Sequence, residues 1–510
     1  MVVAVKGVRN IFGRFMSVFS ARIGTTLLAI LTTPIIARLL GPGRYGDYAV
    51  MLAVFSIWMI PVSSAVTQGV QKYVSEVRDS ATWQENVIRF YGIVAALLGV
   101  GGGVCLLVFS ALGGPERLFG PDFALYFLLL AGLVLASQFR ALTQHVVLGY
   151  GLEHVSGPID VAKKTLTVVV GIGLVVVFGF GVDGMLAGHI VAELTVGVVA
   201  AAVITRRVSV GALLRSTPNS FPVRELLSFN GQNVVLVLLV MSLYHVDVLM
   251  LRSMAGSQTT GWYKAALSLA EYVWAAPKAL QMVLLHTSST LWSEDRRDEI
   301  TNLATRISRY TLLLVLLLAI GLGALADAVV PLYYGEDFAV AATPLLLLLP
   351  GVVGFAVARP LQAIGQGSGR LRTLILAGGV AAGINLALNA LLIPQFGMYG
   401  AAVATSTSYG SMLVCMVWAA RRIGFDPLAD VRIGRIVATA VGSAVPILAL
   451  VRSIDSNLVA LLVVPPVGLA VYSVLAVVTG AVTNDEVRAV LRKTPDPFGA
   501  VLEAGFVKLQ

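Results

Sequence analysis

The chain has 510 residues, of which 57% are hydrophobic and 12% are charged, and its mean hydropathy is +0.87. Soluble domains carry about 25% charged residues, so this composition excludes a soluble enzyme, a disordered chain and a disulfide scaffold. The 36 Lys and Arg outnumber the 27 Asp and Glu, which gives a net charge of +9. The class that remains is a multi-pass membrane protein, which we expect in the cell membrane.

Fourteen apolar runs are each long enough to cross a membrane, which needs about 20 mostly apolar residues. The runs are continuously apolar rather than alternating, which favours helices over a β-barrel. The sequence therefore predicts an all-α polytopic membrane protein of about 14 transmembrane helices. In chain order the runs are 17–40, 47–71, 88–111, 123–148, 158–180, 182–204, 228–252, 261–286, 306–329, 343–366, 370–394, 397–420, 433–452 and 457–480.

The placement of positive charge tests this count, because Lys and Arg concentrate in cytoplasmic loops. With the N-terminus in the cytosol, 26 of the 36 Lys and Arg fall in inner segments and five fall in outer connections. The remaining five lie within the runs. A bias of this size supports fourteen spans with both termini cytosolic.

The chain also contains an internal repeat. Seven landmarks recur in the same order at offsets of 214 to 219 residues, among them Pro61 with Pro277 and Arg140 with Arg359. Six spans separate the copies, so both enter the membrane in the same direction, as parallel repeats do. The predicted organisation is an N-terminal six-helix lobe (1–204), a cytosolic linker (205–227), a C-terminal six-helix lobe (228–422), helices 13 and 14 (423–480) and a cytosolic tail (481–510).

Five cations lie within the runs, where a charge is costly and usually faces a cavity. Guanidinium and ammonium groups in a water-filled cleft favour an anion, above all a phosphate. We therefore predict an anionic head group as the ligand of a central cavity. The cations are Arg22, Arg140, Lys264, Lys278 and Arg359.

The eighth run carries Lys264, Glu271 and Lys278 at intervals of seven residues. Seven residues are close to two helical turns, so one continuous helix would place all three on one face. The two lysines would then lie about 21 Å apart along the axis. The alternative is that each lysine extends toward its nearer membrane surface.

Three acids lie within the runs and are candidates for coupling or gating: Glu193, Asp247 and Glu271. Asp247 and Lys264 lie at similar depth in adjacent spans, so we expect them to pair and to fix a helix hairpin or gate the outer side. Glu193 follows His189 by one turn, and the alternative for it is a structural hydrogen bond with that histidine.

No motif of a soluble enzyme is present. The chain has no Walker loop, no HExxH and no GxSxG, and its connections are too short for a catalytic domain. No cluster of metal ligands is seen either. The sequence predicts a transporter without a cofactor or metal, and leaves coupling to Na⁺ or H⁺ open.

Several motifs resemble the polysaccharide-type flippases of the multidrug/oligosaccharidyl-lipid/polysaccharide superfamily. They are ARLLGPGRYG (37–46), VDVLML (246–251), GWYKAA (261–266), NALLIPQFG (389–397) and YGAAVAT (399–405). The resemblance covers the first twelve runs, and the last two fit by number only. The chain departs from many relatives in carrying HTSS (286–289) where they have a proline.

The resemblance implies a flippase that moves a polyprenyl- or dolichyl-(di)phosphate-linked oligosaccharide to the outer leaflet by alternating access of two lobes. It implies that cations of the first and eighth helices, here Arg22, Lys264 and Lys278, serve the head group. The implied partners are the lipid-linked glycan, membrane lipids, and a glycosyltransferase, polymerase or oligosaccharyltransferase of the same pathway, with no nucleic acid. The alternatives are a cation-coupled multidrug exporter and a non-transporting scaffold for glycan assembly.

Overall fold

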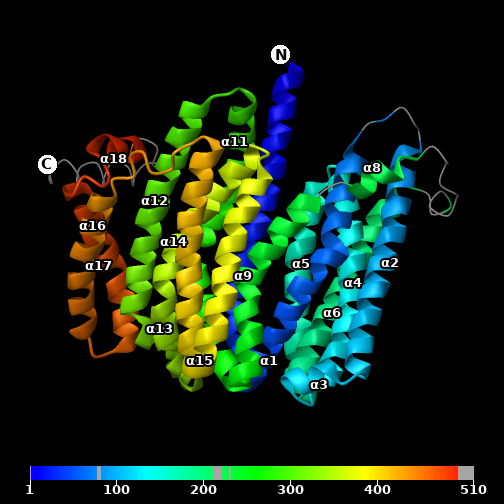
Figure 1. Cartoon of the computed structure of the whole chain (residues 1–510), viewed down its shortest axis with the longest axis horizontal. Coiled ribbons are helices and arrows are strands. Elements are labelled where there is room, and N and C mark those ends of the chain that lie inside the picture. Colours follow the sequence, from blue (N-terminus) through cyan, green and yellow to red (C-terminus); the bar gives the residue numbers. More distant parts are fainter. Residues whose placement is uncertain are drawn as a thin grey trace. The chain divides into compact units, whose positions relative to one another are not determined.

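The computed structural model describes residues 2–76, 78, 82–208, 211, 221–228 and 231–491, and every regular element in this part is a helix (Figure 1). The predicted all-α class is confirmed. The elements are α1 (Val2–Ser75), α2 (Trp83–Ala111), α3 (Gly114–Phe119), α4 (Phe123–Gly149), α5 (Glu153–Phe178), α6 (Gly181–Thr205), α8 (Val223–Ser228), α9 (Gly231–Ala255), α10 (Ser257–Tyr272), α11 (Ala275–Ser293), α12 (Arg297–Ala324), α13 (Ala326–Tyr334), the 3₁₀ helix η1 (Glu336–Ala341), α14 (Ala342–Gly367), α15 (Leu371–Ile423), α16 (Ile433–Arg452), α17 (Asn457–Val478) and α18 (Asn484–Leu491).

Eleven helical segments of the described part are long and apolar enough to cross a membrane. Two of them, of 52 and 53 residues, contain a glycine with non-helical backbone angles. These glycines are Gly41 (φ 68°) in α1 and Gly397 (φ 55°) in α15, and the positive φ suits a residue without a Cβ. Each long element therefore holds two predicted runs joined at a kink. The total of fourteen spans and the cytosolic termini stay predictions.

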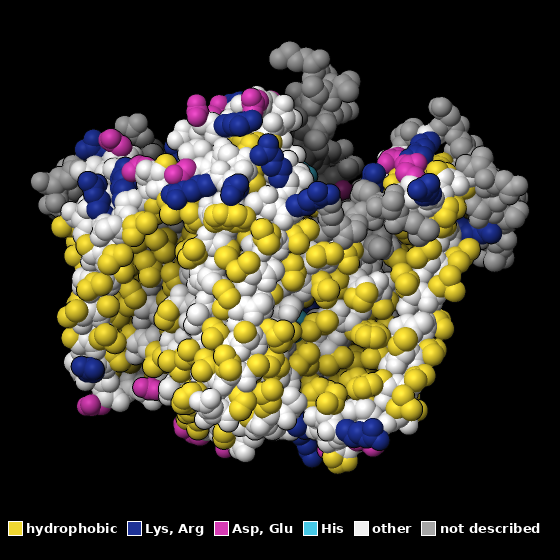
Figure 2. All heavy atoms as spheres, viewed as in Figure 1, with side chains coloured by type: hydrophobic (Ala, Val, Ile, Leu, Met, Phe, Trp, Pro, Cys, Tyr) yellow, Lys and Arg dark blue, Asp and Glu magenta, His cyan; other side chains and the backbone are white. Residues whose placement is uncertain are grey.

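Apolar side chains cover the lengths of the helices on the face drawn in Figure 2, and charged side chains gather toward the helix ends. Large apolar residues such as Leu97, Val177 and Val478 are among the exposed ones. A water-soluble fold would bury many of these side chains, whereas lipid is their natural neighbour. The chain is therefore a multi-pass membrane protein.

The helices form two compact units. Unit 1 comprises Met1–Ser268, Tyr333–Pro344 and Leu371–Ser408, and in it α4 packs against α1, α2 and α6. Unit 2 comprises Leu269–Leu332, Leu345–Arg370 and Tyr409–Gln510, and in it α16 packs against α17 and α12. The division into two six-helix lobes stays a prediction.

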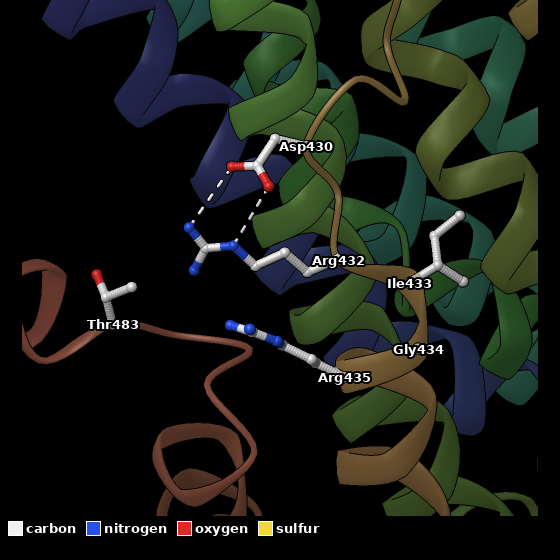
Figure 3. Close-up of a pocket in the computed structure, with 6 residues that line it drawn as sticks. All are labelled: Asp430, Arg432, Ile433, Gly434, Arg435 and Thr483. Atoms are coloured by element: carbon white, nitrogen blue, oxygen red, sulfur yellow. Dashed lines mark hydrogen bonds and ion pairs between the residues drawn. The ribbon is translucent and has the colours of Figure 1, made fainter.

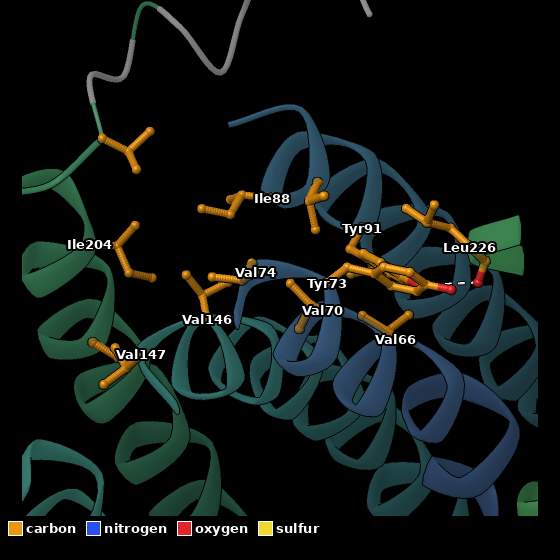
Figure 4. Packing of buried hydrophobic residues seen from close by; sticks show 14 of the residues in the cluster. Val66, Val70, Tyr73, Val74, Ile88, Tyr91, Val146, Val147, Ile204 and Leu226 are labelled. Atoms are coloured by element: carbon orange, nitrogen blue, oxygen red, sulfur yellow. Dashed lines mark hydrogen bonds between the residues drawn. The ribbon is translucent and has the colours of Figure 1, made fainter. Parts of the chain in front are cut away.

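Unit 1 contains a cluster of buried apolar residues that includes Tyr73, Tyr91 and Leu226 (Figure 4). Leu226 lies on the short helix α8, within the predicted linker, and is buried. Tyr91 donates a hydrogen bond to the carbonyl of Leu226 (3.1 Å), and Arg78 forms an ion pair with Glu225 (2.8 Å). These contacts fasten α8 to the core of unit 1.

The prediction of one continuous helix over 261–286 is wrong. Helix α10 ends at Tyr272 and α11 begins at Ala275. Pro277 has no N–H to donate to Val273, and its ring clashes with the carbonyl of that residue in a regular helix. The N–H of Trp274 instead bonds to the carbonyl of Glu271 (3.2 Å), three residues back.

Within unit 1, α1 and α10 meet backbone to backbone at Gly46 and Gly261. A Cβ on Gly46 would overlap the carbonyl oxygen of Ser257 and lie 2.8 Å from the amide nitrogen of Gly261. A Cβ on Gly261 would overlap the carbonyl of Pro42. The motifs ARLLGPGRYG and GWYKAA are thus in direct contact, and both contact residues must be glycine.

Candidate functional site

Asp247 lies in the interior of unit 1, where α9 holds its side chain fully out of solvent (0% exposed). Its carboxylate accepts hydrogen bonds from the amide of Val248 (2.8 Å), the hydroxyl of Thr405 (3.0 Å) and the hydroxyl of Tyr263. No Lys or Arg of the described ranges forms an ion pair with it. The groups that donate hydrogen bonds to this buried acid are therefore all neutral.

Further polar side chains of α15 extend this site. Asn385 donates to the hydroxyl of Ser408 (3.0 Å) and lies 3.5 Å from that of Thr405, and Asn389 donates to Asn385 (3.1 Å). All four are buried. We call the set the Asp247 cluster, and it consists of Asp247, Tyr263, Asn385, Asn389, Thr405 and Ser408.

The predicted pair between Asp247 and Lys264 is not formed, and this prediction is wrong. Tyr263 and Lys264 are adjacent on α10, so their side chains leave the helix about 100° apart. The tyrosine points at Asp247 and thereby turns the lysine away from it. Lys264 instead lines a cavity of about 210 Å³.

This cavity lies within unit 1, between the second half of α1, α9 and α10. Its polar lining includes Tyr45, Tyr48, Ser56, His245 and Lys264. The Lys264 residue as a whole is half-buried. A small anionic group in this space would meet one ammonium and several hydroxyl and imidazole hydrogen-bonding groups.

Arg140 belongs to a different polar cluster of unit 1. It donates from α4 to the carboxylate of Glu193 on α6 and to Gln144, and Lys163 on α5 lies 3.5 Å from the same carboxylate. The predicted alternative of a Glu193–His189 hydrogen bond is wrong, because His189 bonds to the hydroxyl of Tyr48 (2.8 Å). Glu193 thus joins three helices through two cations.

Arg359 lies on α14 in unit 2 and is only 7% exposed. Its guanidinium donates to the side chain of Gln281 (3.0 Å), which in turn donates to the Arg359 carbonyl (3.1 Å). The guanidinium carbon is 5.3 Å from the ring centre of Trp274 and 5.6 Å from that of Phe355. A cation held over aromatic faces in this way is favourable inside a protein.

The other predicted residues are dispersed. Glu271 is half-buried on α10 and Lys278 is exposed on α11, and the helix break between them removes the basis for a continuous polar face with Lys264. The side chain of Arg22 lies outside the described residues.

Sequence reasoning missed the roles of Tyr263, Thr405 and Lys163. Tyr263 and Thr405 belong to the motifs GWYKAA and YGAAVAT, which carry the family resemblance. Those motifs could therefore have pointed to both residues.

Two family models match the chain, and each match spans more than half of its length. The model described as "Polysaccharide biosynthesis protein" matches residues 13–274, and the model described as "Lipid II flippase MurJ" matches residues 162–464. The second description, with the membrane-spanning fold, indicates a transporter rather than an enzyme. The chain belongs to the polysaccharide and lipid-linked glycan flippases of the multidrug/oligosaccharidyl-lipid/polysaccharide superfamily.

Individual relatives agree with this assignment. The "Probable low-salt glycan biosynthesis flippase Agl15" of Haloferax volcanii is 23% identical over 407 residues, which are 77% of this chain and 80% of that protein. The structure titled "Lipid II flippase MurJ, inward closed conformation" matches with a TM-score of 0.74 at 14% identity, over 91% of this chain and 98% of that one. An inward-facing multidrug transporter of the MATE family gives 0.66 at 15% identity, over 79% and 98%. These structural matches show a shared fold.

Proposed function

We propose that the protein moves a polyprenyl- or dolichyl-(di)phosphate-linked oligosaccharide from the cytosolic to the outer leaflet of the cell membrane by alternating access. One observation carries the proposal: the half-buried residue Lys264 lines a cavity of unit 1 in a chain of the flippase family. An ammonium in such a place suits a phosphate. The name of the Haloferax volcanii relative supports a glycan as the cargo.

We assign the head group first to Lys264, with Arg22 and Lys278 as further contacts along its path. We keep Arg140 and Arg359 as proposed contacts of the head group, but we rank them below Lys264. Their guanidinium groups already have protein partners, so binding a phosphate would cost them those hydrogen bonds.

We propose the Asp247 cluster as the site of the coupling cation, Na⁺ or H⁺. A buried carboxylate without a cationic partner is costly unless a proton or a metal ion neutralises it. Hydroxyl and amide oxygens beside it are hard ligands that suit Na⁺. Among the described residues no three His, Cys, Asp or Glu lie together, so a single carboxylate favours a monovalent over a divalent cation.

The activity is tested with purified protein in proteoliposomes that contain a short-chain polyprenyl-diphosphate oligosaccharide. An external glycosidase measures how fast the glycan appears at the outer surface. We expect Lys264→Gln to lower the initial rate at least tenfold, and Lys264→Arg to retain part of it. Lys72→Gln is the matched control, because Lys72 is exposed and lies on α1 of the same unit.

Equal rates for wild type, Lys264→Gln and empty vesicles would reject the proposal. Export of a cationic dye without glycan movement would favour the multidrug exporter. In cells, deletion followed by mass spectrometry of lipid-linked glycans should reveal an intermediate that accumulates on the cytosolic leaflet. The identity of that intermediate would also name the pathway enzymes that act before and after the protein.

A further inference from the structure

Unit 2 contains a cavity of its own, of about 480 Å³, at the start of α16 (Figure 3). It opens to solvent and has no residue in common with the Lys264 cavity. Its lining consists of Asp430, Arg432, Ile433, Gly434, Arg435 and Thr483.

The guanidinium groups of Arg432 and Arg435 give this cavity positive charge. Figure 3 shows both side chains extending toward Thr483. Arg435 donates to the carbonyl of Gly480 (3.1 Å), and no carboxylate of the described part forms an ion pair with it. Arg432 donates to both carboxylate oxygens of Asp430 (3.4 and 3.5 Å) and to the carbonyl of Gly480 (3.4 Å), and the Asp430 carboxylate is two-thirds exposed. A guanidinium has five N–H donors, so both arginines keep donors for a ligand.

The backbone adds to the positive potential. The 20-residue helix α16 begins at Ile433 without a side-chain cap, because Arg432 holds the cap position with φ +58°. The first N–H groups of a helix have no partner within it and carry the positive end of the helix dipole. Gly434 has open space where a Cβ would lie, so an anion can approach this end of the helix closely.

The surroundings of the cavity are those of a membrane surface. Helices α16 and α17 are both long and apolar enough to span a membrane, and the cavity lies where α16 begins and beyond the last residue of α17. Ile433 lines the cavity and also starts an exposed apolar face of α16 with the spacing of one helix side. That face continues through Val437, Val441, Val445 and Leu448.

We propose that this cavity binds the phosphate head group of an anionic membrane lipid, whose acyl chain lies along the exposed face of α16. Basic pockets between transmembrane helices at the membrane surface recognise such head groups. The two guanidinium groups supply the charge-assisted hydrogen bonds to the phosphate. This lipid stays bound to the transporter and is not its cargo, and the site shares no lining residue with the Lys264 cavity.

The test uses the full-length protein in a neutral detergent and measures the shift in its melting temperature on titration with phosphatidylglycerol. Phosphatidylcholine and soluble glycerol phosphate are the comparison ligands. We expect phosphatidylglycerol alone to raise the melting temperature. Arg435→Gln should weaken the apparent affinity at least fivefold, while Arg452→Gln at the other end of α16 leaves it unchanged.

A second variant keeps the test decisive if Arg435→Gln does not fold. Gly434→Asp puts a carboxylate into the cavity at a position where a negative charge stabilises a helix start. We expect this variant to melt no lower than Gly434→Asn and yet to lose the response to phosphatidylglycerol. An unchanged response in Arg435→Gln or Gly434→Asp, or an equal response to glycerol phosphate, would overturn the proposal.

Discussion

Arg140 on α4 donates to the carboxylate of Glu193 on α6 in the interior of unit 1, and Lys163 on α5 shares that carboxylate. One acid therefore compensates two cations and joins three helices. Glu193→Gln would leave these cations close together without a counter-charge. Removing one partner of a buried ion pair costs about 3 kcal/mol or more.

We expect Glu193→Gln to unfold at clearly lower temperature and denaturant concentration than wild type in detergent. Glu116→Gln, at an exposed acid of α3, should unfold like wild type. Adding Arg140→Gln to Glu193→Gln should recover part of the lost stability. A double variant that is no better than the single one would show that the helices are joined by other contacts.

The second prediction concerns Asp247. Its substitution by the neutral asparagine should change the coupling to a cation gradient without disturbing folding, so the two effects can be measured separately. In Asp247→Asn, an amide oxygen in the place of Oδ2 still accepts from the hydroxyls of Tyr263 and Thr405, and only the Val248 amide loses this acceptor. A neutral amide also costs less to bury than a carboxylate. We expect the variant to fold with unchanged or higher stability. Its glycan movement in proteoliposomes should no longer respond to a Na⁺ or pH gradient.

The control is Asp455→Asn, because Asp455 is exposed between α16 and α17. A gradient response that survives in Asp247→Asn would place the coupling cation elsewhere.

The anchoring of α8 gives a third prediction. Leu226→Ala removes a buried side chain from the cluster around Tyr73 and Tyr91, a change that costs about 2 kcal/mol or more. Amide hydrogen exchange of residues 223–228 should then speed up at least tenfold. Val223→Ala, at an exposed residue of the same helix, should exchange like wild type. Equal exchange in the two variants would mean that apolar packing does not hold α8.

Acid pH should weaken the docking of α18. Burial would raise the pKa of Glu486, but the Thr483 amide, the Tyr310 and Thr483 hydroxyls and the Arg309 guanidinium outweigh it and lower the pKa below its ordinary value of 4.5. A lowered pKa contributes stability that is present above pH 4.5 and is lost as the pH falls through the folded-state value. The wild type should therefore melt higher than Glu486→Gln at neutral pH.

This difference in melting temperature should shrink as the pH falls below 4.5. If the difference in melting temperature between wild type and Glu486→Gln does not change with pH, the substitution acts through packing and not through charge.

Much of the fold follows from the sequence because membrane helices are long, uniform apolar runs. The kinks at Gly41 and Gly397 fall at or beside the boundaries of predicted runs, where glycine permits positive φ. The helix break before Pro277 could also have been predicted from the sequence, because a proline inside a helix removes a backbone hydrogen bond. The seven-residue spacing of Lys264, Glu271 and Lys278 predicts one helix instead, and that prediction is wrong.

The site was predictable only in part. Buried acids and cations stand out against an apolar background, so Asp247, Glu193 and Lys264 were recognised from the sequence. Their partners were not, because one step along α10 turns a side chain by about 100° and decides between Tyr263 and Lys264. Contacts between distant segments, such as Asp247 with Thr405, depend on packing that no local pattern contains.

The contact between Gly46 and Gly261 has a consequence for the evolution of the family. The atoms that would obstruct a side chain at these positions are main-chain carbonyl atoms of Ser257 and Pro42, which every amino acid possesses. No second substitution can remove such an obstruction, so the two positions cannot exchange residues in a compensating pair. Methods that infer proximity from correlated substitutions will therefore be blind to this contact, although here the two helices touch through their backbones.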